Sequence, residues 1–166
     1  MTKTNTLFAA LLAALTTAAL AQSPEGADLV VRATAFESTE GQATIILLNA
    51  ETAWSQMMDD RSGENPAWKQ HAAVADRPIE AGAAAVRFTG LQPGEYALMV
   101  FHDENANRKI DRNMMGMPKE EIGVSNDYRM SGFPPRKPTW DDVKFTVQPG
   151  TNEKRVAMGM LREARR

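Results

Sequence analysis

Cysteine is absent from this chain of 166 residues. The absence excludes disulfide bonds, thiolate metal sites and a cysteine nucleophile. The fold must therefore be stabilised by packing and hydrogen bonds, with or without a metal ion bound through other side chains. Histidine is scarce as well, because His71 and His102 are the only two in the sequence. General acid–base chemistry at neutral pH thus has few candidates.

A strong net charge is also lacking. Lysine and arginine number 19, aspartate and glutamate number 21, and the formal net charge is −2. Without a large basic field, nucleic acid is not an expected partner. The chain also lacks a glycine-rich phosphate loop and a regular alternation of strands with helices. These two absences argue against a nucleotide-binding α/β fold.

Long apolar runs are limited to one, between Leu7 and Ala21. A lysine precedes this run, and small residues end it with the spacing of a cleavage site. We therefore predict residues 1–21 as a secretory signal peptide, with a periplasmic or secreted localisation. A membrane anchor is the alternative, but the run is short for a bilayer and no second span follows it. Residues 22–166 are then expected to form a single domain.

Apolar and polar residues alternate along much of the remaining chain, which is typical of strands with one buried face. Ala27–Ser38 and Ala43–Ala50 are the first two predicted strands. Because only a short turn around Gly41 separates them, we expect them to form an antiparallel hairpin. Further strands are predicted over Ala84–Leu91 and Glu95–Asp103.

The pattern weakens between Glu51 and Ala84, and we interpret this stretch as a long connection. An Asn-Pro pair fits the start of one short helix over residues 65–73 within it. Asp141–Gly150 and Glu153–Leu161 are predicted as a final strand pair. The sum of these elements predicts an all-β fold, an antiparallel Greek-key β-sandwich of about seven strands with one short helix in a long loop.

The segment FHDENANRKIDRN, from Phe101 to Asn113, carries the strongest chemical signal. Oxygen-bearing side chains fall at alternate positions, as at the start of an EF-hand calcium loop, whose tight turn directs alternate residues at one ion. The residues at the first, third, fifth, seventh and ninth positions of such a loop are Asp103, Asn105, Asn107, Lys109 through its carbonyl oxygen, and Asp111. The pattern predicts a metal site with calcium as its ion.

Three features depart from a calcium loop. Arg108 replaces the usual glycine, Met114 replaces the bidentate glutamate, and neighbouring basic residues offset the carboxylates. A carboxylate from Glu120, Glu121 or Asp127 would have to replace that glutamate. We predict Glu120 as the completing ligand, and a pairing of Glu120 with Arg108 or Arg112 is the alternative. A metal-free turn, in which aspartate and asparagine side chains bond their own backbone, is the alternative to the calcium site as a whole.

A longer stretch, FTGLQPGEYALMVFHDENANRKIDRNMMGMPKEEIGVSND followed by PTWDDVKFTV, resembles a family of exported bacterial proteins catalogued as domain of unknown function 2141. The residues that match the family pattern are Gly90, Pro93, Gly94, Tyr96, Phe101 to Asn105, Asn107, Asp111, Asn113, Gly116, Pro118, Glu120, Gly123, Ser125 and Asn126. The resemblance implies an immunoglobulin-like or prealbumin-like β-sandwich exported to the periplasm, and it implies no activity. Arg108 departs from the family, which commonly has glycine there.

Two other chemistries fit residues of this region. A hydrolase would use His102, with Ser125 and Asp127 completing a catalytic triad. A periplasmic copper-binding protein would use His102 with Met114 and Met115, since thioethers select Cu(I), although methionines also fill irregular apolar gaps.

The sequence therefore predicts an exported, non-catalytic binding or structural module that calcium stabilises through the loop of residues 103–111. Its expected partner is a protein or small ligand that the sequence does not specify. Tryptophans fit either the wall of a binding site or the core, and the three of them are Trp54, Trp68 and Trp140.

Overall fold

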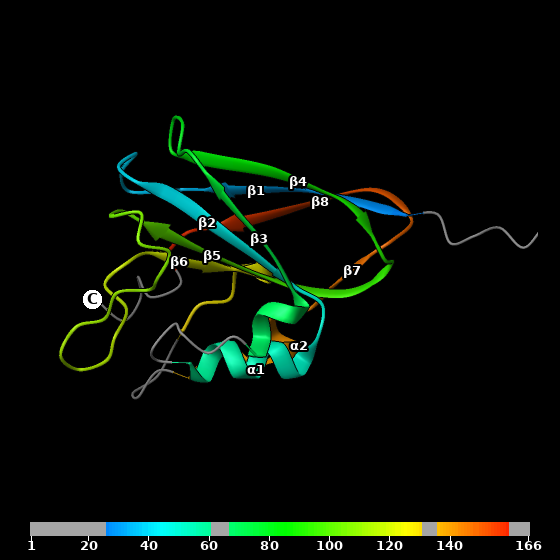
Figure 1. The fold of residues 1–166 in the computed structure, drawn as a ribbon. Helices are drawn as coiled ribbons and strands as arrows, with labels where there is room; N and C mark the ends of the chain where they lie inside the picture. Colours follow the sequence, from blue (N-terminus) through cyan, green and yellow to red (C-terminus); the bar gives the residue numbers. More distant parts are fainter. Residues whose placement is uncertain (1–25, 61–66, 131–135, 160–166) are drawn as a thin grey trace, which may run out of the picture.

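Two β-sheets dominate the computed structural model, which describes residues 26–60, 67–130 and 136–159 (Figure 1). The smaller sheet has three strands in the order β4-β1-β8. These strands are β1 (Ala27–Thr34), β4 (Ala83–Leu91) and β8 (Gly150–Ala157). β1 pairs with β4 in antiparallel fashion and with β8 in parallel fashion. Parallel neighbours need a long connection, and all the intervening elements supply it here.

The larger sheet has five strands, in the order β3-β2-β5-β6 with β7 paired to the first residues of β5. All of its pairs are antiparallel. The strands are β2 (Gln42–Leu48), β3 (Ala72–Arg77), β5 (Gly94–Asp103), β6 (Ile122–Val124) and β7 (Phe145–Val147).

The main core lies between the two sheets and takes every second residue of their strands. Successive side chains of a strand point to opposite faces, so the alternation in the sequence places one set inside. This set includes Leu29, Val31, Ala33, Ile45, Leu47, Val86, Phe88, Leu98 and Val100, which form one buried cluster.

Short helices cover the opposite face of the larger sheet, which is therefore buried on both sides (Figure 1). They are α1 (Glu51–Asp59), the 3-10 helix η1 (Ala67–His71) and α2 (Trp140–Val143), and a second 3-10 helix, η2 (Ser125–Asp127), directly follows β6. A strand covered on both faces has an almost continuous apolar sequence, as β2 and β5 have. This outer core includes Ile46, Leu48, Trp54, Met57, Trp68, Met99, Phe101, Ile122 and Trp140.

The predicted hairpin of the first two strands is wrong, because β1 and β2 belong to different sheets. Residues 35–41 carry the chain from one sheet to the other. Ala35 and Gly41 both adopt left-handed backbone conformations, with φ of 67° and 68°, and Phe36 between them is buried in the core. A connection of this length spans the roughly 10 Å between packed sheets as readily as it closes a hairpin.

The predicted final strand pair is wrong as well, since β7 pairs with β5 and β8 pairs with β1. Residues 141–143, predicted as strand, belong instead to the helix α2. Thr139 and Asp142 form a capping box that satisfies backbone groups at the start of α2. Leu161, the predicted end of the last strand, lies outside the described residues.

The stretch from Glu51 to Ala84 is more regular than predicted. It holds α1 and β3 besides η1, which lies within the predicted short helix. The described residues thus contain eight strands, where about seven are predicted, and one pair is parallel where all are predicted antiparallel. α1 has no side-chain cap at Ala50, so it lacks the usual N-terminal signal and is held by burial of Ala53, Trp54 and Met57.

No helix in the ranges that the structure describes is long and apolar enough to cross a membrane. The predicted signal peptide, residues 1–21, lies outside those ranges.

Gly41 gives a test of how closely the β1–β2 connection packs on the end of β5. A Cβ at Gly41 would lie 2.2 Å from the backbone oxygen of Asp103, whereas a Cβ at Gly90, which also has φ of 68°, would meet nothing within 4 Å. We expect Gly90→Ala to cost about 1–2 kcal/mol through its backbone conformation alone. Gly41→Ala is expected to cost about 1–3 kcal/mol more, as measured by urea unfolding. Equal losses for the two variants would show that the close approach is absent.

Candidate functional site

The loop between β5 and β6 begins at Asp103, whose carboxylate organises its first turn. The side chain is fully buried and accepts three hydrogen bonds, from the backbone N–H of Asn107 (3.0 Å), the backbone N–H of Arg108 (2.8 Å) and Nε2 of Gln42 (2.9 Å). Ala106 and Arg108 take left-handed conformations, with φ of 56° and 59°. Such a turn directs successive N–H groups at one anion, here the Asp103 carboxylate.

Asn105 and Asn107 extend this turn through their own backbone. Asn105 Oδ1 accepts from the N–H of Asn107 at 3.1 Å, and Asn107 Oδ1 accepts from the N–H of Lys109 at 2.7 Å. Their amide nitrogens donate to the carboxylate of Asp111, at 2.8 Å from Asn105 and 3.3 Å from Asn107. The alternating side chains thus converge on the inside of the loop, in the hydrogen-bonded Asx arrangement.

Glu120 reaches back to the same loop and does not pair with either arginine. Its Oε2 accepts from the N–H of Asp111 at 3.3 Å. Arg108 instead pairs with Asp76 on β3 at 2.8 Å, and Arg112 donates to the carbonyl of Gly116 at 3.0 Å. The pKa of Glu120 is raised to about 7. Burial is the largest cause, and the nearby carboxylates of Asp103, Asp111 and Glu104 add to it.

The structure therefore gathers five of the six residues predicted as calcium ligands, namely Asp103, Asn105, Asn107, Asp111 and Glu120, into one hydrogen-bonded network. The sixth, Lys109, follows in the same turn and lines a cavity on the other side of the loop. Arg108 adopts the left-handed conformation for which glycine is usual at the sixth position of a calcium loop. N–H donors of the loop engage the oxygens, and the described residues contain no group of three or more His, Cys, Asp or Glu placed to hold a metal.

The residues of the hydrolase hypothesis have separate partners. His102 is buried at the end of β5 and its Nε2 lies 2.7 Å from the carbonyl oxygen of Glu40. Ser125 donates to the carbonyl of Val143 and accepts from the N–H of Leu98. Asp127 accepts from the N–H of Ala157. Within the described ranges no hydrogen bond joins His102, Ser125 and Asp127 to one another.

The methionines of the copper hypothesis are divided between solvent and a cavity. Met114 is fully exposed and Met115 is 84% exposed, while His102 is only 1% exposed. Met115 and Met117 line a cavity together with Met57, Met58, Met99 and Met130 from other elements. Met115 thus lies with other methionines around an apolar space, Met114 lies in solvent, and His102 lies in the core.

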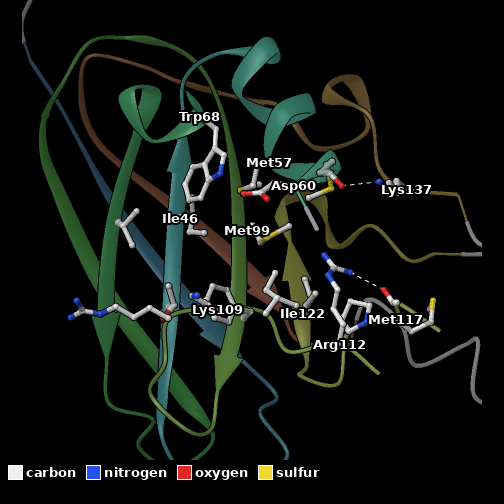
Figure 2. Close-up of a pocket in the computed structure, with 18 of the residues that line it drawn as sticks. Ile46, Met57, Asp60, Trp68, Met99, Lys109, Arg112, Met117, Ile122 and Lys137 are labelled. Carbon is white, nitrogen blue, oxygen red and sulfur yellow. Dashed lines mark hydrogen bonds between the residues drawn. The ribbon is translucent and has the colours of Figure 1, made fainter. Parts of the chain in front are cut away.

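This cavity, of about 520 Å³, lies on the outer face of the larger sheet (Figure 2). Its floor is formed by Ile46 of β2, Met99 and Phe101 of β5, and Ile122 of β6. Met57 from α1 and Trp68 from η1 form one wall, and the loop of residues 108–118 forms the opposite wall. The loop that Asp103 organises is therefore also a side of the cavity.

Basic residues surround this apolar space. The charged residues that line it are Lys69, Arg108, Lys109, Arg112 and Lys137, with Asp60 as the one acid. Some of the cations have partners close by. Arg108 pairs with Asp76, Lys137 contacts Asp59 and the carbonyl of Met58, and Lys69 lies over the ring of Trp68.

Two buried donors at the cavity have no partner. Trp68 Nε1 and Arg112 Nε are the only buried side-chain nitrogen or oxygen atoms of the described residues without a hydrogen bond. Both residues line this cavity, and Figure 2 shows them on either side of Ile46, Met99 and Ile122. Buried donors without protein partners are rare, and each needs an explanation such as strain, a water, an ion or a bound molecule. The clustering of tryptophan and methionine is a weak sequence signal for such a cavity. Sequence reasoning missed it because its lining residues come from six helices and strands and from the loops between them.

The raised pKa of Glu120 predicts a pH-dependent cost to the fold. Below about pH 4 the carboxyl is protonated in both folded and unfolded states, and the penalty grows between about pH 4.5 and 7 and is constant above that range. Glu120→Gln keeps an oxygen for the N–H of Asp111 and removes the charge. In EDTA we expect this variant to be more stable than the native protein by about 1–3 kcal/mol near pH 8 and equal to it near pH 4.

Urea unfolding at the two pH values measures this difference, with Glu153→Gln on the exposed side of β8 as the matched control. A gain for Glu120→Gln that is equal at both pH values would contradict the assignment of the penalty to its charge.

Comparison with known families finds one match. A model described as "Uncharacterized protein conserved in bacteria (DUF2141)" matches residues 31–155, which include both sheets and the whole of the β5–β6 loop. Comparisons with curated proteins and with solved structures find no match. Since the match covers most of the chain, this protein belongs to the DUF2141 family of uncharacterised bacterial proteins.

Proposed function

We propose that this protein is an exported, non-catalytic binding module that holds a small apolar ligand in the cavity on the outer face of its larger sheet. The observation that carries the proposal is the cavity of about 520 Å³, with an apolar floor and walls from α1, η1 and the β5–β6 loop. Binding sites for small molecules typically measure about 300–1,000 Å³ and are lined mainly by apolar side chains with a few polar groups.

The composition of the walls supports ligand binding. Methionine side chains from several elements contribute to the lining, and their flexible thioethers adapt to different apolar shapes. The floor is rigid by comparison, because it consists of the central strands of a sheet that is buried on both faces. Because the floor is already ordered, a ligand can bind without a large cost for ordering the site, and the flexible walls can adapt to its shape.

The amino-terminal pattern supports export to the periplasm or beyond the cell. For the scaffold we propose a Greek-key β-sandwich of immunoglobulin-like or prealbumin-like type. Two sheets that enclose one core support this assignment.

We further propose that calcium binds in the loop of residues 103–111 and stabilises the wall that this loop provides. The nearness of Asp103 and Asp111 to Glu120 supports it, because a cation would offset the burial and the neighbouring negative charges that together raise the pKa of Glu120. The left-handed Arg108 supports it too, since this is the conformation of the sixth residue in a calcium loop. Binding would require the oxygens of Asp103 and Asn105 to exchange N–H donors for the ion.

Filling the cavity tests the ligand proposal. N-phenylnaphthylamine is a neutral apolar dye whose emission rises when it leaves water, and we expect it to bind the native protein. Ile46→Trp should weaken binding at least about tenfold, because the indole occupies the floor of the cavity. Val30→Trp, on the outer face of the smaller sheet, is the matched control and should bind as the native protein does.

Thermal melts of both variants check that they fold. If Ile46→Trp does not, Val74→Trp at the half-exposed edge of the cavity replaces it. Failure of the dye to bind the native protein, or equal binding by the filled and control variants, would refute the proposal.

Calcium is tested by thermal melts near pH 8. With a Kd of about 1 mM, as in extracellular modules, about 10 mM calcium adds about 1.4 kcal/mol to the free energy of unfolding. The expected rise in Tm is about 5 °C relative to EDTA. Asp111→Asn and Glu120→Gln should lose this rise, while Glu153→Gln should retain it. Identical melts of the native protein in calcium and in EDTA would contradict calcium binding.

A further inference from the structure

We infer that the ligand of the cavity is a single-chain fatty acid, whose carboxylate binds Arg112 and whose acyl chain lies over Ile46, Met99 and Ile122. The inference rests on the proposed function and adds the chemical class of the ligand to it. It is argued from the charges that line the cavity, from the hydrogen bonds of Arg112 and from the shape of the apolar floor.

The charges of the cavity favour an anion. Five of its lining residues are lysine or arginine and only one is acidic. Asp76 neutralises Arg108, and Asp59 neutralises Lys137. Arg112 has no acidic partner within the described residues. A ligand with one negative group would therefore meet positive potential in a site of reduced polarity, where charge pairs are stronger than in water.

Arg112 is held in place for such a group. One Nη1 hydrogen bond to the carbonyl of Gly116, at 3.0 Å, positions the guanidinium, and its backbone forms a bridge with Pro118. Its Nε is buried and has no acceptor. The terminal N–H groups of a guanidinium lie in parallel, and such a pair matches the two oxygens of a carboxylate.

The floor extends from Arg112 toward Trp68 as an apolar surface. Figure 2 shows Ile122, Met99 and Ile46 in this interval, with the indole of Trp68 at its far end. An extended apolar surface with one cationic end fits a linear chain with a terminal anion. The volume suits one chain, since ligands of drug size occupy sites of about 300–1,000 Å³.

Displacement of N-phenylnaphthylamine from the full-length protein tests the inference, with dodecanoate and dodecanol as the two probes. We expect dodecanoate to displace the dye at a concentration at least about tenfold lower than dodecanol does, because only the carboxylate engages Arg112. Shorter carboxylates should bind more weakly, by about fourfold for each methylene that is lost.

Arg112→Met keeps the apolar stem and removes the charge, so it should bring the two probes within about twofold of each other. Arg112→Lys should restore part of the preference, because it returns the charge without the bidentate geometry. Arg32→Met, at an exposed position on β1 in the other sheet, is the matched control and should leave the preference unchanged.

Several outcomes would overturn the inference. Equal affinity of the native protein for dodecanol and dodecanoate would do so, and so would a preference for dodecanoate that survives Arg112→Met. The protein could instead sediment with phosphatidylglycerol vesicles in a manner that depends on Arg112, while dodecanoate fails to displace the dye. That result would assign the site to a membrane surface. An Arg112-dependent dimer in sedimentation velocity would assign it to a second copy of the chain. In each of these cases the dye still binds and the proposed function stands, whereas no dye binding at all would refute both.

Discussion

The buried carboxylate of Asp103 is the constraint on which the rest of the candidate site depends. It joins the start of β2, through Gln42, to two consecutive backbone N–H groups of the β5–β6 loop. Hydrogen bonds to a charged acceptor contribute about 1.5–3 kcal/mol each, and a buried carboxylate without them would be costly. The left-handed residues Ala106 and Arg108 are tolerated because they deliver these donors. The loop therefore leaves the sheet in one direction, and its far side becomes a wall of the cavity.

The cavity itself follows from the double burial of the larger sheet. One face of β2 and β5 packs on the smaller sheet, and the other face needs a cover. α1 and η1 cover one part of that face and the β5–β6 loop approaches another part, so an apolar space is left between them. The scaffold thus combines a well-packed inner core with an outer core that has room for a ligand.

The loop serves two sets of residues on its two sides. Its inner side holds the carboxylates and amides that the sequence pattern predicts as a calcium site, and its outer side presents Lys109, Arg112 and Met117 to the cavity. Left-handed conformations at Ala106 and Arg108 change the direction of the chain within the loop, so one segment can supply both sets. An ion on the inner side would act on ligand binding through the position of the outer side, because the two share one backbone.

The sequence alone determined the residues that point inward along β1 and β4, because a period of two leaves little freedom once one face is apolar. It also determined that Asp103, Asn105, Asn107 and Asp111 would converge, since their spacing and the local Asx turns are properties of a short segment. The tertiary structure decided which strands pair. The seven residues between β1 and β2 suit a hairpin and a crossing between sheets equally. Only the burial of Phe36 and of the apolar faces of both strands selects the crossing. It also decided the cavity, because Trp68, Met99 and Arg112 are distant in the sequence and meet only when α1, η1 and the loop pack on the same face of the larger sheet.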